Sequence, residues 1–137
     1  MYTISHNQLL ASINKINQSY PVVIPVPVEN GFYLKHFPQK SWDDSYWFYA
    51  PIRTAQSLKS FFYPPQQKIA DYPAVNDKIP EYTPKAIIGV KACDVAALKI
   101  IDRVYGQGDY PDPSYLRARN KNIIMSMDCL EAGEYCA

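Results

Sequence analysis

Hydrophobic positions near the start of the chain recur with the period of a helix. The spacing predicts an amphipathic α-helix over residues 5–20, because apolar side chains three and four residues apart share one helical face. The residues that form this face are Leu9, Ile13, Ile16 and Tyr20. Ser5 and Gln8 have the spacing of a capping box, in which each side chain accepts a hydrogen bond from the backbone N–H of the other residue. The helix is therefore predicted to begin at Ser5.

The next apolar residues change to the period of a β-strand. In "VVIPVPVENGFYLKHF" an alternating apolar segment meets Asn30 and Gly31, the usual signal for a two-residue hairpin turn. A second strand is expected over residues 32–37. Proline has no backbone N–H to donate to a neighbouring strand, so Pro25 and Pro27 predict that the first strand of the hairpin lies at an edge of its sheet.

Residues 38–84 are rich in proline and aromatic side chains and show no regular period. One short helix is expected within "RTAQSLKSFFYPP", and it must end before Pro64. The aromatic side chains need a surface to pack on. This stretch therefore either covers the protein's own core or docks on a partner, in which case Trp42, Trp47 and Phe61 would form an exposed apolar patch.

The last third of the chain predicts a strand, a helix and a second strand. "KAIIGVK" and "NIIMSMDC" are short apolar runs typical of strands buried on both faces. Between them, "DVAALKIIDRVYG" has a helical period, with Gly106 as its expected C-terminal cap. The residues of its apolar stripe are Ala97, Leu98, Ile101 and Val104. This order of elements forms a right-handed crossover with parallel strands. The predicted fold class is thus α/β: a small mixed sheet with an N-terminal helix and hairpin, and a C-terminal parallel β-α-β crossover.

Length and charge narrow the classes of function. The 137 residues are enough for a single α/β domain over residues 1–137 with a core of its own. The 14 basic and 13 acidic residues give a net charge of +1 without a long run of either sign, which argues against a nucleic-acid or anionic-membrane surface. The N-terminus has no apolar secretory segment, and no stretch approaches the roughly 20 apolar residues of a membrane span. The sequence predicts a cytoplasmic protein.

Three cysteines carry the candidate chemistry. Cys93 comes just past the end of the first parallel strand, and Cys129 closes the second. Because the carboxyl ends of parallel strands meet at one edge of a sheet, these two thiols are expected at the same rim. Cys136 follows in "LEAGEYCA", where a glycine allows the chain to turn back toward them. An odd number of cysteines in a reducing compartment suggests metal binding or thiol chemistry before disulfides.

The residues alone leave three roles open for these thiols: ligand of a metal or cluster, reactive nucleophile, and small buried residue. A nucleophile needs a base, and the two histidines, His6 and His36, belong to the predicted first helix and hairpin. Zinc sites usually contain paired cysteines such as C-x-x-C, a spacing that does not occur in the sequence. The G-x-G-x-x-G of a dinucleotide site is also missing from it.

The charged residues expected near the rim each have two interpretations. Asp94 is predicted to be the N-cap of the helix, with a ligand role as the alternative. Four basic residues either line the rim, where they would hold an anionic substrate or offset the charge of a cluster, or form solvated surface and ion pairs. They are Arg53, Lys91, Arg117 and Arg119.

The sequence "IIGVKACDVAALKIIDRVYGQGDYPDPSYLRARNKNIIMSMDCLEAGEYC" resembles a family of iron-sulfur subunits. This family includes the beta chain of sulfhydrogenase and an iron-sulfur chain of anaerobic sulfite reductase. The motifs that carry the resemblance are "GVKACD", "DYPDPSYLRARN" and "MDCLEAGEYC". With "PIRTAQSLKSFFYPPQQKIADY" upstream, the resemblance covers about residues 46–136.

The resemblance implies electron transfer through [4Fe-4S] clusters in a cytoplasmic oxidoreductase, with other subunits of a redox complex as partners. It implies that Cys93, Cys129 and Cys136 are cluster ligands, with Asp94 and Lys91 beside them in the cofactor site. Family members carry Arg-Pro where this chain has Lys-Ala before its first cysteine, and they continue into a ferredoxin-like segment that these residues do not include. A homo-oligomer, a non-redox interaction module and a thiol enzyme that uses Cys93 stay open as alternatives.

Overall fold

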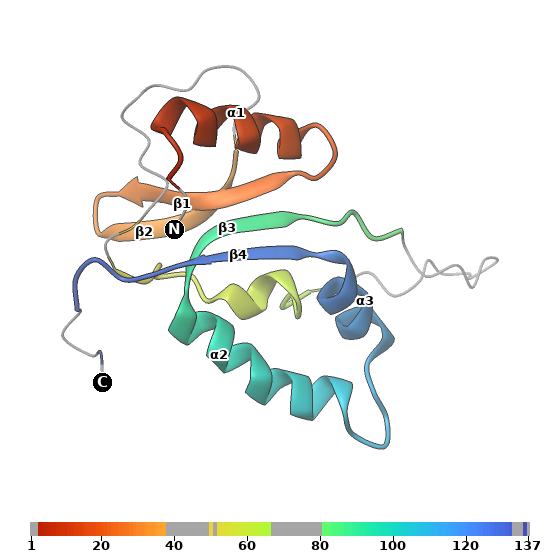
Figure 1. Ribbon diagram of the computed structural model, residues 1–137. Helices are drawn as coiled ribbons and strands as arrows, with labels where there is room; N and C mark the ends of the chain where they lie inside the picture. Colours follow the sequence, from red (N-terminus) through yellow and green to blue (C-terminus); the bar gives the residue numbers. More distant parts are fainter. Residues whose placement is uncertain (1–2, 38–49, 51, 67–80, 133–135, 137) are drawn as a thin grey trace.

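A four-stranded mixed sheet carries helices on both of its faces (Figure 1). The computed structural model describes residues 3–37, 50, 52–66, 81–132 and 136. In chain order the elements are α1 (His6–Asn17), β1 (Val22–Val28), β2 (Gly31–His36), the 3-10 helix η1 (Leu58–Phe61), β3 (Ala86–Lys91), α2 (Ala92–Ile101), the π-helical turn η2 (Asp102–Gly106), α3 (Pro113–Lys121) and β4 (Ile123–Met127). The strands lie in the order β2-β1-β3-β4, with α1 on one face and η1, α2 and α3 on the other. The predicted α/β class, with its N-terminal helix and hairpin and its parallel crossover, is confirmed.

A capping box fixes the start of α1 at the predicted residue. The Ser5 hydroxyl accepts a hydrogen bond from the Gln8 N–H at 3.3 Å, and the Gln8 side chain accepts one from the Ser5 N–H at 2.9 Å. Ile13 is buried and packs on the sheet. The helix ends at Asn17, earlier than predicted, because the Asn17 side chain accepts a hydrogen bond from the N–H of Val22 at 3.0 Å and turns the chain directly into β1.

The strand β1 is internal, so its predicted position at a sheet edge is wrong. It pairs antiparallel with β2 along its length but pairs with β3 only at Val22 and Val23. Pro25 and Pro27 come after this short contact, and their missing N–H groups leave the β1·β3 pairing intact. The prolines are tolerated in this internal strand because β3 pairs only with the first residues of β1, which precede both prolines.

The strand β4 is the other edge of the sheet and is not buried on both faces as predicted. Ile124 packs against the core beneath α2 and α3. The neighbouring side chains of Ile123 and Met125 are 39% and 41% exposed. The reason is that α1 covers the centre of the opposite face: within the described residues, the buried cluster around α1 takes its strand residues from β1 and β3 and none from β4.

The helix α2 buries a narrower face than its apolar sequence predicts. Leu98 is buried, with Val95 and Ile101 half-buried beside it on the core. Ala97 and Val104, predicted to share this stripe, are exposed. Successive helical residues are separated by about 100°, so both positions lie roughly 100° or more around the helix from Leu98.

Helical structure continues beyond α2 through the π turn. Gly106, the predicted cap, is the last residue of that turn and has no positive φ, and Gln107 takes the capping position. The helical segment therefore runs slightly further than the sequence predicts before it turns toward α3.

A β-bulge at Gly89 interrupts the pairing of β3 with β4. Ile88 pairs with Met125 and Val90 with Ser126, which leaves Gly89 without a partner across the strand. Its φ of 85° is the left-handed conformation that glycine adopts without steric cost. Ile88 packs on the α1 side and Val90 on the α2 side, although residues two apart normally share a face. The bulge thus sets which side chains the end of β3 presents to each layer.

Substitution of this glycine tests the bulge. Gly89→Ala is expected to lower the free energy of unfolding by about 1–3 kcal/mol, because a side chain at positive φ is strained. Gly108→Ala is the control, since Gly108 does not have a positive φ and an added Cβ would meet the Val104 carbonyl oxygen at an ordinary 3.6 Å. Urea unfolding of both variants measures the difference, and equal stabilities would contradict the assigned bulge.

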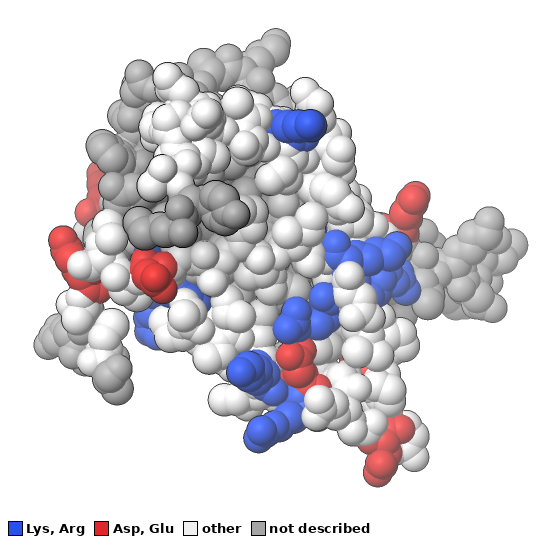
Figure 2. All heavy atoms as spheres, viewed as in Figure 1, with Lys and Arg blue, Asp and Glu red and all other residues white. Residues whose placement is uncertain are grey.

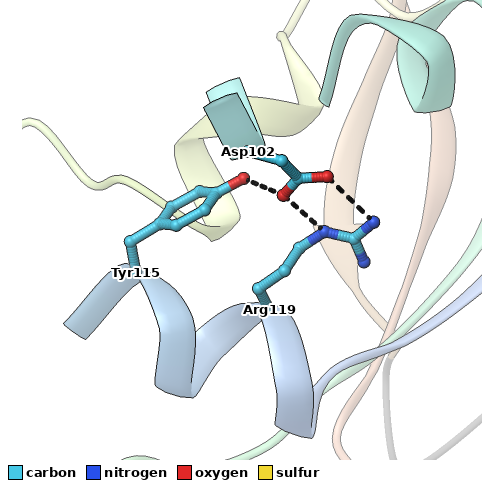
Figure 3. A network of polar contacts seen from close by, with 3 residues as sticks. All are labelled: Asp102, Tyr115 and Arg119. Carbon is cyan, nitrogen blue, oxygen red and sulfur yellow. Dashed lines mark hydrogen bonds and ion pairs between the residues drawn. The ribbon is translucent and has the colours of Figure 1, made fainter. Parts of the chain in front are cut away.

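A polar network joins the end of α2 to α3 (Figure 3). The Tyr115 hydroxyl donates a hydrogen bond of 2.6 Å to the Asp102 carboxylate, and the Arg119 Nε donates one of 3.0 Å to the same oxygen. Burial raises the pKa of Asp102, but these two hydrogen bonds and the charge of Arg119 outweigh it, and the pKa lies below its ordinary value. Burial, and then the bond to Asp102, raise the pKa of Tyr115 far above its usual range.

The lowered pKa of Asp102 makes the stability of the network depend on pH. A carboxyl whose pKa is lower in the folded than in the unfolded chain stabilises the fold above its ordinary pKa of about 3.9, and this stabilisation is lost as the pH falls through the folded value. Asp102→Asn should therefore destabilise the protein by about 1–3 kcal/mol at pH 7, and the difference from wild type should shrink in acid. Urea unfolding across this pH range tests it, with Asp109→Asn at an exposed position as control. A deficit that persists unchanged in acid would contradict it.

Candidate functional site

The carboxyl ends of β3 and β4 lie at the same edge of the sheet. The two strands are parallel, and their last paired residues are Lys91 and Met127. From this edge β3 runs directly into α2, which carries Cys93, and β4 leads to Cys129 (Figure 1). Because β1 is parallel to β3, the hairpin turn that follows β1 reaches the same edge. The topology predicted from the crossover thus places two of the three cysteines as expected.

All three cysteines line one cavity of about 870 Å³ at this edge. Its walls are residues 30–32 of the hairpin, 52–55, 92–93 at the start of α2, and 129–132 and 136 after β4. The thiols of Cys93, Cys129 and Cys136 are exposed and form no disulfide. Their exposure contradicts the interpretation of these cysteines as small buried residues.

The thiols border the cavity without meeting at one point. Within the residues that the structure describes, no group of three cysteine, histidine or carboxylate side chains is close enough to hold a single metal ion. A larger group that bridges the thiols has the space of a typical ligand pocket, which is roughly 300–1,000 Å³.

Lys91 is buried beside the cysteine-bearing turns and does not belong to the solvated surface. It is 1% exposed, and its Nζ donates a hydrogen bond of 2.9 Å to the carbonyl oxygen of Asp128. Lys91 precedes Cys93 by two residues and Asp128 directly precedes Cys129, so one side chain connects the two turns. No carboxylate of the described residues pairs with this ammonium group. Within the described residues, the Asp128 carbonyl is thus the hydrogen-bond partner of this buried ammonium group.

Asp94 does not cap α2, contrary to the prediction. The helix begins at Ala92 with Lys91 as N-cap, because β3 passes into α2 without an intervening loop, and Asp94 falls in the first helical turn. Burial raises the pKa of Asp94, and the positive charge of Arg53 opposes this shift. Arg53 lines the cavity, whereas Asp94 is not one of its lining residues. A positive charge therefore lines the cavity, and a carboxyl group lies in the first turn of α2.

The other two basic candidates are not at this rim. Arg117 and Arg119 belong to α3, which precedes β4 and therefore lies toward the opposite edge of the sheet, on the right of Figure 1. Arg119 pairs with Asp102. Of the four basic residues considered from the sequence, the structure places Arg53 and Lys91 near the cysteines.

Apart from Arg53, which was one of the four basic residues considered for the rim, the sequence did not predict the walls of the cavity that come from the first half of the chain. Phe32 lines it from the hairpin, and its carbonyl oxygen accepts a hydrogen bond of 2.8 Å from the N–H of Ala55, which carries the segment with Ile52 and Arg53 to the cavity. The Asn30-Gly31 motif predicted the turn but not that the turn would lie at the cavity. That position depends on the pairing of β1 with β3, which no short sequence motif indicates.

Comparisons with known proteins give one partial likeness. The chain is 40% identical to the sulfhydrogenase 2 subunit beta of Pyrococcus furiosus over 50 residues, which are 36% of this chain and 14% of that protein. The chain thus spans a small part of this relative's length. No family model and no solved structure matches the chain. In the part of the chain that the structure describes, no helix is both long and apolar enough to cross a membrane.

Thiol labelling distinguishes a shared cysteine site from a single reactive nucleophile. All three thiols should react with iodoacetamide in the folded protein, because all three are exposed, and unfolding in urea should add no further label. Peptide mass spectrometry at neutral pH measures each rate. Fast, selective alkylation of Cys93 would favour a thiol enzyme, and a thiol that reacts only after unfolding would contradict the exposed placement.

Proposed function

We propose that this chain forms an electron-transfer domain of a multi-subunit oxidoreductase and holds a [4Fe-4S] cluster through Cys93, Cys129 and Cys136. The observation that carries the proposal is that three thiols, one from the start of α2 and two from the segment after β4, line one cavity at the carboxyl ends of parallel strands. The partial likeness to a sulfhydrogenase subunit supports this class of function.

The residues of the cavity suit a cluster in their chemistry. Thiolates are the usual ligands of iron-sulfur clusters, and three of them from this chain leave one iron position for a ligand from elsewhere. The cluster, when bound, supplies one-electron transfer.

The chain's own residues prepare this site in two ways. Lys91 holds the turn before Cys129 through the Asp128 carbonyl and places a buried positive charge near ligands that bind as anions. Cys93 lies in the first turn of α2, where unpaired N–H groups and the helix dipole stabilise negative charge. Both features lie next to residues proposed as cluster ligands.

The alternative functions gain no support from the described residues. A thiol enzyme needs a base, and the described lining of the cavity contains no histidine. His36 ends β2 at the edge opposite the hairpin turn, and His6 begins α1. For an interaction module built on the aromatic stretch, Phe61 packs against the core, and Trp42 and Trp47 lie outside the described residues.

The proposal extends to the setting of the protein. We propose other subunits of a redox complex as its partners, and the cytoplasm as its location, because the resemblance found in the sequence implies both. The single domain over residues 1–137 is part of the same proposal.

Anaerobic reconstitution with iron and sulfide tests the cluster. The wild-type chain should gain a broad visible absorption together with bound iron and sulfide, and Cys93→Ala, Cys129→Ala and Cys136→Ala should each reduce it. Ser12→Ala, at an exposed position on α1, is the matched control and should behave as wild type. A folded wild-type chain that stays colourless and free of iron would overturn the proposal, as would cysteine variants that assemble the cluster normally.

A further inference from the structure

The helix α2 is apolar on the side that faces solvent as well as on the side that faces the core. Ile100 is 67% exposed and Val104 61% exposed, and they lie four residues apart on one helical face. Ala96 and Ala97 continue this face toward the start of the helix. Figure 1 shows α2 as the outermost element on its side of the sheet. We call Ala96, Ala97 and Ile100 of α2, together with Val104 of the adjoining turn η2, the outer face of α2.

The outer face differs from the usual surface of a helix in a monomer. A helix that is hydrophobic all round is normally buried, whereas a surface helix directs polar side chains to solvent. The helix α1 of the same protein follows that rule, since its exposed positions include Asn7, Ser12, Asn14 and Lys15. Single exposed apolar residues are common, whereas contiguous exposed apolar patches are typical of interaction surfaces.

Basic side chains border the outer face. Lys99 and Arg103 lie next to Ile100 and Val104 along the helix, and within the described residues neither makes an ion pair. The acidic residue of the π turn, Asp102, is engaged by Tyr115 and Arg119 on the α3 side. Figure 2 shows basic side chains gathered over α2 and α3 in the lower part of the view. The apolar row is therefore flanked by positive charge.

This positive charge indicates which kind of protein binds to the outer face. A second copy of the chain related by a two-fold axis would bring Lys99 and Arg103 against their own equivalents, and like charges in contact are unfavourable. A different protein whose apolar surface has an acidic border would meet both features at once. The charge complementarity thus favours a partner subunit over self-association.

The position of α2 connects this surface to the cysteine cavity. The helix starts at the cavity, where Ala92 and Cys93 form part of the lining, and the outer face follows within the next turn. We propose that the outer face of α2 docks on the acidic-bordered apolar surface of a partner redox protein and so holds that partner beside the cysteine cavity. This inference rests on the proposed electron-transfer function.

Photo-crosslinking identifies the occupant. Benzoylphenylalanine in place of Ile100 is compared with the same probe in place of Ser12 on α1, in cells that express the chain from its own gene. The expected result is a crosslink from position 100, and not from position 12, to an acidic surface of a redox subunit. A crosslink to a second copy, equal crosslinks from both positions, or none from position 100 would overturn the proposal.

Calorimetry with the purified, crosslinked partner then measures the contribution of each feature. Ile100→Ser should weaken binding about tenfold, because truncation of a central apolar contact costs more than about 1 kcal/mol. The double variant Lys99→Glu and Arg103→Glu should also weaken it and reduce its dependence on salt. Unchanged affinity in both variants would contradict the assigned surface.

Two measurements separate this inference from the proposed function. Binding is measured on cluster-free protein, so a failed reconstitution leaves the docking test valid. Ile100→Ser is made at an exposed position away from the cysteines, and it should keep wild-type thermal stability and normal cluster assembly while it weakens docking. Wild-type docking by this variant, together with normal assembly, would overturn the docking surface and leave the proposed cluster site standing.

Discussion

The arrangement of the site depends on the parallel pairing of β3 with β4. Their register brings Lys91 opposite Met127, so that each strand ends at the same level and releases a cysteine-bearing turn within two residues. The bulge at Gly89 fixes this last step, because it adds a residue to β3 before the pairing ends. The hydrogen bond from Lys91 to the Asp128 carbonyl then joins the two turns beyond the strands, where the ladder no longer acts.

The segment that connects β3 to β4 is held together at the opposite ends of these strands. The chain that leaves α2 must return through α3 to start β4, and the network of Asp102, Tyr115 and Arg119 holds α3 against the end of α2. Tyr115 is also buried in the core with Leu98. The network thus packs α3 against the end of α2 directly before β4, the strand that leads to Cys129.

Local signals predicted the elements, while burial depended on pairing that no local signal reveals. The capping box placed the start of α1, and Asn30-Gly31 placed the hairpin turn. The prolines of β1 predicted a strand at the edge of the sheet. The position of a strand depends on which strands pair with it, and β1 pairs with β3 through its first residues only. The apolar run of β4 indicated burial on both faces, although α1 covers only the centre of the sheet. In the site, the crossover rule placed Cys93 and Cys129 at one edge, and Arg53 was among the basic residues considered for it. The hairpin wall, by contrast, depends on β1·β3 contacts that join distant parts of the chain.

One docked partner would explain two features of the described chain. The cavity offers three thiols, one fewer than the four ligands that a [4Fe-4S] cluster usually takes, and α2 carries apolar side chains on a face that the rest of the described chain leaves exposed. These features are adjacent, because α2 begins at the cavity. A single partner seated along α2 would cover the apolar row and bring its own side chains to the cavity edge. The direct passage of β3 into α2 thus joins the proposed cofactor site and the proposed docking surface in one continuous element.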